Sequence, residues 1–330
     1  MRKDYIAVIG LGNIAARHRK NLKQIFPEAR ILAIATRMYI PSIVPDYCDE
    51  ILESLDELLS RRIRFVVIAS PAPFHIAHAL PFIEAGVPVL IEKPVAASVQ
   101  DAKRLLKKCL DFDTPVAIGY CLRYLPSGLV LKKMLEEQKI GPLLNVSAEA
   151  GQFLPDWRPG KNYRETVSAN AHLGGGALLE LSHEIDYCFW LLGELSLHSA
   201  ILRSSKTLSL EVEDSVDLLA TVNGAAVVSV HLDFLQSAPY RRCRFVGEAG
   251  ALEWDLITNT LSLRAKENFK IIYQDPLWQS NSLYIEMIRD FNNLIEGKQN
   301  QCVSVEEAIQ TLSFAETVKK NGSFIGTDKS

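Results

Sequence analysis

Short apolar runs alternate with amphipathic segments along the first 121 residues of the chain. The apolar runs lie at residues 5–9, 30–35, 65–69, 87–91 and 116–120. Each run is short and nearly continuous in hydrophobic side chains, which predicts a strand buried on both faces. Helices are expected between them, up to residue 25 after the first run and at residues 54–60, 75–85 and 98–110. This alternation predicts a doubly wound α/β domain with a parallel sheet over residues 1–121.

The pattern changes after residue 121. Loose apolar–polar alternation covers residues 143–153, 212–222 and 225–235, and strand-like segments follow at 242–246, 250–255 and 260–265. Asn223-Gly224 lies between two of these segments and is a strong signal for a hairpin. Helices are expected at 127–138, 177–192, 282–296 and 304–319. We therefore expect residues 122–330 to form an α+β domain with a large, mostly antiparallel open sheet. Its final helix, about 304–320, is expected to pack back on the N-terminal domain.

A glycine-rich turn follows the first apolar run directly. Residues 10–15 have the G-x-G-x-x-A spacing of turns that bind dinucleotides. Gly10 permits the tight turn, Gly12 lets a pyrophosphate approach the backbone, and Ala15 lets the following helix lie close to the strand. The predicted dinucleotide site comprises Gly10, Gly12, Asn13, Ile14 and Ala15. The alternative is an ordinary connection between a strand and a helix.

Composition narrows the class of protein. The chain has 330 residues, 48% of them hydrophobic, which suits two domains better than one core. Its net charge of −3 argues against nucleic-acid binding, and no apolar stretch has the length of a membrane span. The six cysteines are scattered without a C-x-x-C pair, so neither a zinc site nor a disulfide framework is suggested. A reducing cytoplasm fits this pattern best.

The end of the second apolar run bears on the choice of cofactor. NAD sites usually have an acidic residue there for the ribose 2′-hydroxyl, but no acid follows until Asp46. Thr36 and Arg37 occupy the place instead, and an arginine there suits a 2′-phosphate. This favours NADP over NAD. The alternative is that Arg37 points to solvent or stacks on adenine.

Further motifs resemble one family of enzymes. Ser70-Pro71-Ala72-Pro73-Phe74-His75 follows the third apolar run, Glu92-Lys93-Pro94 follows the fourth, and a glycine run at residues 174–176 precedes His183 and Asp186. With the glycine turn, these resemble the glucose–fructose oxidoreductase/inositol dehydrogenase/MocA family over essentially the whole chain. The resemblance implies a Rossmann domain that binds NAD(P) over residues 1–121 and a substrate-binding and oligomerisation domain with a large open sheet over residues 122–330. It also implies nicotinamide-dependent chemistry on sugars, cyclitols or nucleotide sugars. It also implies cofactor contacts by Ser70, Pro71, His75, Glu92 and Lys93.

Lys93 is the predicted catalytic residue of the first domain. Oxidation of a secondary alcohol needs a group that takes the hydroxyl proton, and the carboxyl end of a parallel strand is where ligands of such sheets bind. A lysine held there in a cleft has a lowered pKa and is able to shuttle the proton. The alternative is a surface charge. The resemblance contributes most to the catalytic interpretation.

His183 is the predicted catalytic residue of the second domain. Glu180 lies three residues before it and Asp186 three after, so the three are expected on one helix face, where the acids orient the imidazole. The family commonly has an aspartate four residues before this histidine, and this chain departs from that pattern. A helix-surface charge row is the alternative. A metal site is not expected, because no further ligands have suitable spacing.

Additional side chains are predicted to contact substrate. The loop at residues 156–164 carries Trp157, Arg158 and Tyr163, which suit stacking on a sugar and pairing with an anion. A solvated loop with one buried tryptophan is the alternative. Arg123 and Tyr124, just after the first domain, resemble the family's crossover segment, which implies that they line the cleft. The predicted substrate contacts are Lys93, Tyr120, Arg123, Trp157, Arg158, Tyr163, Glu180 and His183.

Together these features predict an NAD(P)-dependent oxidoreductase that moves a hydride between a sugar or nucleotide-sugar ring carbon and nicotinamide. A cyclitol dehydrogenase of the inositol type is one alternative, and a non-catalytic dinucleotide sensor is another. We also expect a homodimer or homotetramer, joined through the face of the second sheet that helices do not cover.

Overall fold

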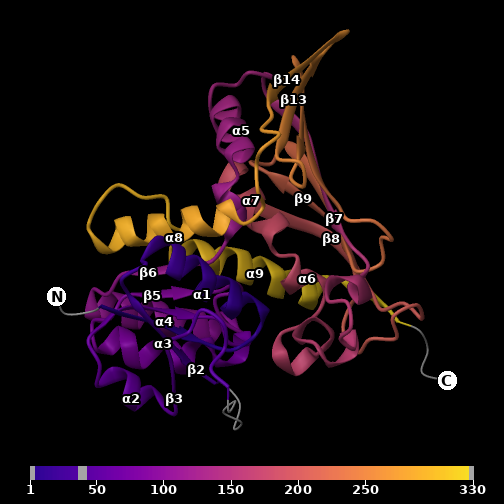
Figure 1. Cartoon of the computed structure of the whole chain (residues 1–330). Helices are drawn as coiled ribbons and strands as arrows, with labels where there is room; N and C mark the ends of the chain where they lie inside the picture. The colour runs from indigo at the N-terminus through magenta and orange to yellow at the C-terminus, as the bar shows by residue number, and fades with distance from the viewer. Residues whose placement is uncertain (1–3, 36–42, 327–330) are drawn as a thin grey trace. The chain divides into compact units, whose positions relative to one another are not determined.

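The computed structural model describes residues 4–35 and 43–326, and the chain in it folds into two compact units (Figure 1). The first unit consists of Met1–Cys121 with Asn281–Leu312, and the second of Leu122–Ser280 with Ser313–Ser330. This differs in one respect from the division expected from the sequence. Asn281–Leu312, expected in the second domain, belongs to the first unit.

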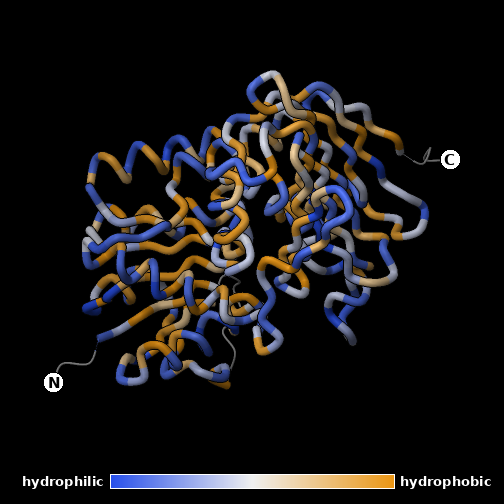
Figure 2. The backbone as a smooth tube through the Cα atoms, turned by 90° about the horizontal axis from the view of Figure 1, so that it is seen from above, coloured by the Kyte–Doolittle hydropathy of each residue, from blue (hydrophilic) through white to orange (hydrophobic). Residues whose placement is uncertain are grey.

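The first unit is built on a six-stranded sheet of order β3-β2-β1-β4-β5-β6, and its described strands all pair in parallel. The strands are β1 (Tyr5–Ile9), β2 (Arg30–Ile34), β3 (Glu50–Leu52), β4 (Ile63–Ile68), β5 (Val89–Ile91) and β6 (Val116–Ile118). Their hydrophobic stretches are visible in Figure 2. The predicted doubly wound parallel sheet is confirmed. The sequence did not predict β3, because its two apolar residues make too short a run to form a pattern.

Helices cover both faces of this sheet. They are α1 (Asn13–Ile25), α2 (Leu55–Leu59), α3 (His75–Glu84), α4 (Val99–Phe112) and α8 (Ser282–Ile295). Ser54 and Ser98 cap the N-termini of α2 and α4 by accepting backbone N–H groups of the first turn. α8 joins the unit through Phe291, which meets Phe65 of β4 edge-on with ring centroids 5.4 Å apart. The chain then continues into α9 (Val305–Asn321), which runs from the first unit into the second.

The second unit contains a nine-stranded sheet of order β14-β13-β12-β11-β7-β10-β9-β8-β15. Its strands are β7 (Leu143–Gly151), β8 (Leu195–Arg203), β9 (Ser215–Val222), β10 (Ala226–Asp233), β11 (Tyr240–Gly247), β12 (Gly250–Asp255), β13 (Thr260–Ala265), β14 (Asn268–Tyr273) and β15 (Ser323–Ile325). Six of the pairings are antiparallel, and β7–β10 and β8–β15 are parallel, so the predicted large, mostly antiparallel sheet is confirmed. The hairpin at Asn223-Gly224 is confirmed as well, with φ of 52° and 65° at its two residues.

Three helices pack on one face of this sheet, namely α5 (Pro126–Glu136), α6 (Ala177–Glu180) and α7 (His183–Leu192). Trp254 of β12 shows the packing: its indole N–H donates to Ser127 Oγ at 2.7 Å, and its ring meets Tyr187 edge-on. The prediction of one helix over residues 177–192 was wrong. Leu181 leaves the helical conformation, with φ of −101° and ψ of 26°, and the helix is divided there.

Burial alternates along the central strands of the second sheet. In β10, Ala226, Val228, Val230 and Leu232 face the core, with 0–2% of each residue exposed. The intervening residues point to the opposite face, where Val227 is 41% and Leu219 of β9 is 47% exposed. We call this side, on which α5, α6 and α7 do not pack, the outer face of the sheet.

Candidate functional site

The glycine turn connects β1 to α1 in the first unit. Gly10 adopts φ of +123°, and a Cβ built on it lies 2.5 Å from the carbonyl oxygen of Ala69. Its N–H donates to the carbonyl of Ile34 at 2.9 Å. Only glycine fits this position, because both the backbone conformation and the space exclude a side chain.

Gly12 has the opposite surroundings. Its backbone is extended, and a Cβ built on it meets nothing within 4 Å. It precedes the N-terminus of α1, whose first turn contains no acidic residue and receives no side-chain cap. Open space in front of helix N–H groups suits a phosphate, so this turn fits the pyrophosphate of a dinucleotide. Asn13 is exposed, Ile14 half-buried and Ala15 fully buried against the sheet.

Thr36 and Arg37, on which the predicted choice between NADP and NAD depends, lie outside the described residues. The preference for NADP therefore stays a prediction.

His75 connects the segments that follow β4 and β5. It begins α3 and is 1% exposed. Its Nδ1 lies 2.9 Å from the carbonyl oxygen of Pro94, and its Nε2 lies 2.7 Å from that of Ser70. Burial lowers the pKa of the imidazole. The ring thus lies between two backbone carbonyls, and a neutral imidazole donates to one of them. A contact of His75 with a cofactor stays a prediction.

Glu92 and Lys93 follow β5 at the carboxyl end of the parallel sheet. Glu92 is 8% exposed, and its Oε1 lies 2.6 Å from Nε2 of His18, which is fully buried in α1. Lys93 is half-buried, and its peptide bond to Pro94 is cis. Sequence reasoning missed the part played by His18. Its signal was a polar residue on the buried side of α1, three residues after Ala15 and four before Leu22.

In the second unit, His183 is the first residue of α7 and is 8% exposed. Glu180 ends α6, so the expected row of Glu180, His183 and Asp186 on one continuous helix is not formed. Ser168 Oγ donates to Glu180 Oε2 at 3.1 Å. Glu180 therefore lies on α6, whereas His183 and Asp186 lie on α7.

Two arginines hold the first turns of α7. Arg123 donates to both oxygens of Asp186, at 3.0 and 2.8 Å, and the two side chains are 4% and 1% exposed. Arg241 donates to both oxygens of Glu184, at 2.7 and 2.8 Å, and the Glu184 side chain is fully buried. Such bidentate pairs fix the direction as well as the position of the helix beside His183. The sequence suggested Arg123 as a substrate contact, and the structure places it in this buried pair.

The predicted loop residues are partly engaged within the second unit. Trp157 donates its indole N–H to the carbonyl of Gln152 at 3.1 Å and packs edge-on against Phe234. Tyr163 donates its hydroxyl to the carbonyl of Leu208 at 3.2 Å, and Arg158 is half-buried. Tyr120, in the first unit, is 1% exposed. Contacts of these residues with substrate stay predictions.

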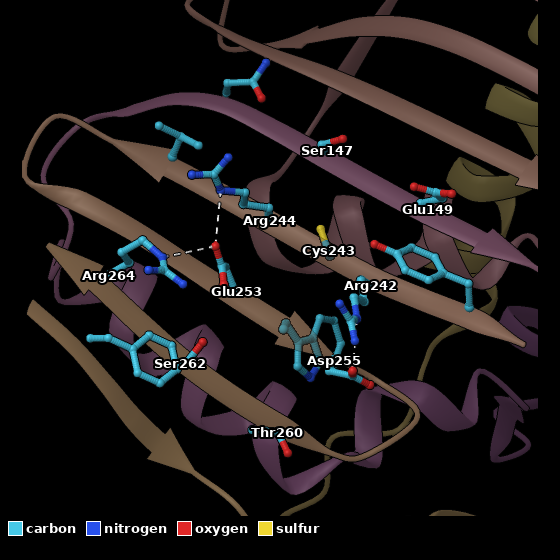
Figure 3. A pocket seen from close by; sticks show the side chains of 15 residues that line it. Ser147, Glu149, Arg242, Cys243, Arg244, Glu253, Asp255, Thr260, Ser262 and Arg264 are labelled. Atoms are coloured by element: carbon cyan, nitrogen blue, oxygen red, sulfur yellow. Dashed lines mark hydrogen bonds and ion pairs between the residues drawn. The ribbon is translucent and has the colours of Figure 1, made fainter. Parts of the chain in front are cut away.

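A hollow of the second unit lies away from the predicted site residues. A cavity of about 700 Å³ opens on the outer face of the sheet, across β7, β11, β12, β13 and β14 (Figure 3). Arg242 pairs with Asp255 there, while Arg244 and Arg264 both approach Glu253 at 3.6 Å. None of the predicted site residues lines this cavity. Among residues 4–35 and 43–326, no cluster of histidine, cysteine, aspartate and glutamate has the arrangement of a metal site. In the same part of the chain, the helices are too short or too polar to cross a membrane.

The sequence and the fold of this chain are similar to those of known dehydrogenases and reductases. The chain is 25% identical to the inositol 2-dehydrogenase of Streptomyces avermitilis over 301 residues, which covers 87% of this chain and 82% of that protein. A levoglucosan dehydrogenase in complex with NADH has the same fold, with a TM-score of 0.83 over 97% of both chains at 20% identity. A 3-ketoreductase from Actinomadura kijaniata, in complex with TDP-benzene and NADP, matches 99% of this chain and all of that chain with a TM-score of 0.81 at 19% identity.

Family models cover both units. Residues 5–120 match the oxidoreductase family with an NAD-binding Rossmann fold, and residues 129–253 match the C-terminal domain of the same family. The chain is therefore a member of the GFO/IDH/MocA family of oxidoreductases.

Proposed function

We propose that this protein is an NAD(P)-dependent dehydrogenase or reductase that acts on a hydroxyl-bearing ring carbon of a sugar or nucleotide sugar. Membership of the oxidoreductase family and the open cradle at Gly12 support the dinucleotide. The names of its relatives, among them a levoglucosan dehydrogenase and a 3-ketoreductase crystallised with TDP-benzene, support a carbohydrate-like substrate. When bound, the nicotinamide supplies the acceptor or donor of the hydride.

The chain's own residues then move the proton. In the oxidation direction, the substrate loses a hydride from carbon and a proton from its hydroxyl, and Lys93 Nζ takes that proton as a neutral amine. In the reduction direction, the lysine ammonium returns the proton to the forming alkoxide. His183 positions the substrate hydroxyl or assists the transfer. The place of Lys93 after β5 and of His183 at the start of α7 supports this assignment.

Substitution of Lys93 tests the assignment. Lys93→Met keeps a long apolar side chain but has no proton acceptor, so turnover falls by about 10²–10⁴ while dinucleotide affinity is retained. His183→Ala should also lower turnover. A variant in which only KM changes would show that His183 binds substrate and takes no part in the chemical step. Steady-state absorbance of the reduced nicotinamide on a panel of sugars and nucleotide sugars measures both. Near-parental turnover of Lys93→Met on the best substrate would remove Lys93 from the reaction.

We infer a preference for NADP. Thr36 and Arg37 stand where an NAD enzyme usually has an acid, and an arginine suits the 2′-phosphate. Arg37→Asp should weaken NADP binding by about 1.5–3 kcal/mol, the range for a hydrogen bond to a charged group, and spare NAD. Calorimetry with both dinucleotides distinguishes this from an equal loss, which would contradict the proposed part of Arg37.

A cyclitol substrate is the second candidate. The observation that favours it is the similarity over 87% of the chain to an inositol 2-dehydrogenase. Parallel assays with myo-inositol and with nucleotide sugars decide between the two by their kcat/KM values. A ligand-binding protein without turnover on any of them would instead be a dinucleotide sensor.

We also propose that the protein assembles as a homodimer or homotetramer through the outer face of the second sheet. That face has exposed apolar residues among charged ones, which suits an interface that is wetter than a core.

A further inference from the structure

Lys93 stands between two residues that are each held by a buried histidine. On its N-terminal side, the Glu92 carboxylate meets Nε2 of His18 at 2.6 Å. On its C-terminal side, the carbonyl of Pro94 meets Nδ1 of His75 at 2.9 Å. The two imidazoles come from different helices, α1 and α3, and are 0% and 1% exposed. The backbone of Lys93 is thus tied on both sides to the core of the first unit.

The His18 contact is itself fixed from several directions. The ring of Tyr284 in α8 meets the imidazole edge-on, with centroids 6.3 Å apart, and Arg17 lies over the same tyrosine ring at 4.5 Å. The amides of Asn21 and Asn281 join α1 and α8 through two hydrogen bonds, at 2.8 and 3.3 Å. With α8 packed on this face of α1, His18 has no room to turn away from Glu92.

The Glu92 carboxylate is confined on its other side as well. A Cβ built on Gly119, just after β6, lies 3.3 Å from Cα, Cδ and Oε1 of Glu92. The absence of a side chain at Gly119 leaves space for the Glu92 carboxylate next to the end of β6. A Cβ at residue 119 would therefore press on Glu92.

The His75 contact continues into a second segment. Its Nε2 lies 2.7 Å from the carbonyl of Ser70, which follows β4, and Ser70 Oγ lies 3.0 Å from Nδ1 of His78. The His75 ring therefore lies between Pro94 and the segment after the neighbouring strand. With its Nδ1–H donating to the carbonyl of Pro94, it restrains the chain on the C-terminal side of Lys93.

We propose that His18 and His75 are positioning residues that hold the Glu92-Lys93-Pro94 segment so that the Lys93 amine is presented at one place. The inference rests on the proposed role of Lys93 in proton transfer. A lysine side chain has four rotatable bonds, and a misplacement of 1 Å at a reacting group lowers rates by as much as about 10²-fold. Fixing the backbone on both sides of the lysine fixes the point from which its side chain extends, so that fewer side-chain conformations have to be restricted to place the amine.

Paired substitutions separate positioning from simple packing. His18→Gln keeps an amide N–H donor at the reach of Nε2, whereas His18→Leu keeps bulk and loses the donor. His75→Asn keeps a donor at the place of Nδ1, toward Pro94, whereas His75→Gln keeps one at the place of Nε2, toward Ser70. The exposed His198 of β8, replaced by leucine, serves as the matched control.

Two measurements are made on each folded variant. The first is kcat, together with dinucleotide affinity by calorimetry. The second is the ¹³C-methyl signal of Lys93 in the reductively methylated protein, assigned by its loss in Lys93→Arg, which needs no turnover. We expect His18→Leu and His75→Gln to shift the Lys93 signal and to lower kcat about 10–100-fold, with dinucleotide affinity within threefold of the parent. In His18→Gln and His75→Asn, the Lys93 signal should lie near its parental position and kcat should be close to that of the parent.

Gly119→Ala keeps the test decisive if the histidine variants do not fold. It should shift the Lys93 signal and lower kcat in the same sense, because its Cβ displaces Glu92 by a few tenths of an ångström. An unmoved Lys93 signal in His18→Leu, His75→Gln and Gly119→Ala would overturn the inference. Equal losses of kcat in His18→Gln and His18→Leu, and in His75→Asn and His75→Gln, would overturn it as well. Full turnover of Lys93→Met would instead overturn the proposed role of Lys93, and the signal would still report whether the histidines hold it.

Discussion

At the scale of single residues, the two glycines of the β1–α1 turn are needed for different reasons. Gly10 is required by the protein itself, because its φ of +123° and the carbonyl of Ala69 leave no room for a side chain. Gly12 is not required by the fold, because its backbone is extended and a Cβ there meets nothing. What Gly12 keeps open is the approach to the N-terminus of α1.

Substitution of Gly12 should therefore abolish binding and spare the fold. Gly12→Val places a branched side chain in front of the N–H groups of α1, so NAD(P) binding should be lost while the thermal unfolding temperature changes little. Gly10→Ala is the contrasting variant and should be destabilised, since backbone and sterics both oppose it. Calorimetry and thermal melts measure the two effects. Parental NAD(P) affinity in folded Gly12→Val would exclude this turn as the pyrophosphate site.

His231 of β10 provides a residue-scale prediction about pH. It lies between Asp233, at 2.9 Å, and Asp217, at 2.7 Å. Hydrogen bonding to Asp233 is the main cause that raises the pKa of His231 to about 9, against 6.5 for an ordinary histidine. A raised pKa means that the folded state binds the proton more tightly. Its stabilising effect is complete below about pH 6.5 and is lost as the pH rises through about 9.

We expect the unfolding temperature of the parent to fall more between pH 7 and pH 10 than that of His231→Gln. His198→Gln, on the neighbouring part of the same sheet, should behave like the parent. Thermal melts in a pH series measure the difference. Parallel curves for His231→Gln and the parent would mean that the two aspartates do not stabilise the charged imidazole.

The sequence supports predictions for Gly10, Gly12 and Lys93, because the proposed chemistry of each has a fixed spacing or a fixed place after a strand. Their contacts with a ligand stay predictions. His18 and Asp186 acquire their roles from partners 74 and 63 residues away, Glu92 and Arg123. No local pattern records such pairings, so only the fold reveals them.

At the scale of elements, α7 depends on two buried ion pairs in its first turns. Removing one partner of the Arg123–Asp186 pair leaves a buried charge uncompensated, which costs about 3–5 kcal/mol. Arg123→Met should therefore lower the free energy of unfolding by about that amount, and Arg123→Met with Asp186→Leu should recover much of it. Urea unfolding measures both.

The surface pair Arg289–Glu286 in α8 is the matched control. Its contact is 2.6 Å, but both side chains are more than half exposed. Arg289→Met should change stability by less than about 1 kcal/mol, because solvent screens an exposed pair. Equal effects of Arg123→Met and Arg289→Met would show that burial of the first pair adds nothing.

Element boundaries were predictable only where a pattern was long. Except for β3, the strands of the first unit are nearly continuous apolar runs and were predicted, whereas β14 is mostly exposed at the edge of its sheet and shows no such pattern. β8 was missed because its register shifts between Leu197 and Ser199, which breaks the alternation. The division at Leu181 was missed because the periodicity of residues 177–192 continues across it.

At the scale of the whole molecule, the fold class followed from the order of patterns, but the strand order of the second sheet did not. β7 pairs in parallel with β10 and antiparallel with β11, although more than 70 residues separate β7 from both along the chain. Asn281–Leu312 likewise belongs to the same unit as Met1–Cys121, which is far from it along the chain. Long-range pairings of this sort depend on packing of the finished core and leave no trace in local periodicity.

The outer face of the second sheet leads to the prediction about assembly. Ile201, Leu219 and Val227 are exposed on the adjacent strands β8, β9 and β10, beside the cavity that arginines and acidic residues line in Figure 3. A face with apolar residues and both signs of charge is able to pair with a second copy of itself. Light scattering at micromolar concentration should therefore give a dimer or tetramer of the 36.8 kDa chain.

Leu219→Lys tests the surface involved. It introduces an ammonium at a position that is 47% exposed in the single chain, so the fold tolerates it, while an interface would have to bury the charge. We expect this variant to sediment as a folded monomer. Leu277→Lys, at a position 88% exposed outside the sheet, should keep the assembly of the parent. A parent that is monomeric at micromolar concentration would refute assembly itself, and a Leu219→Lys variant that stays fully assembled would place the interface on another surface.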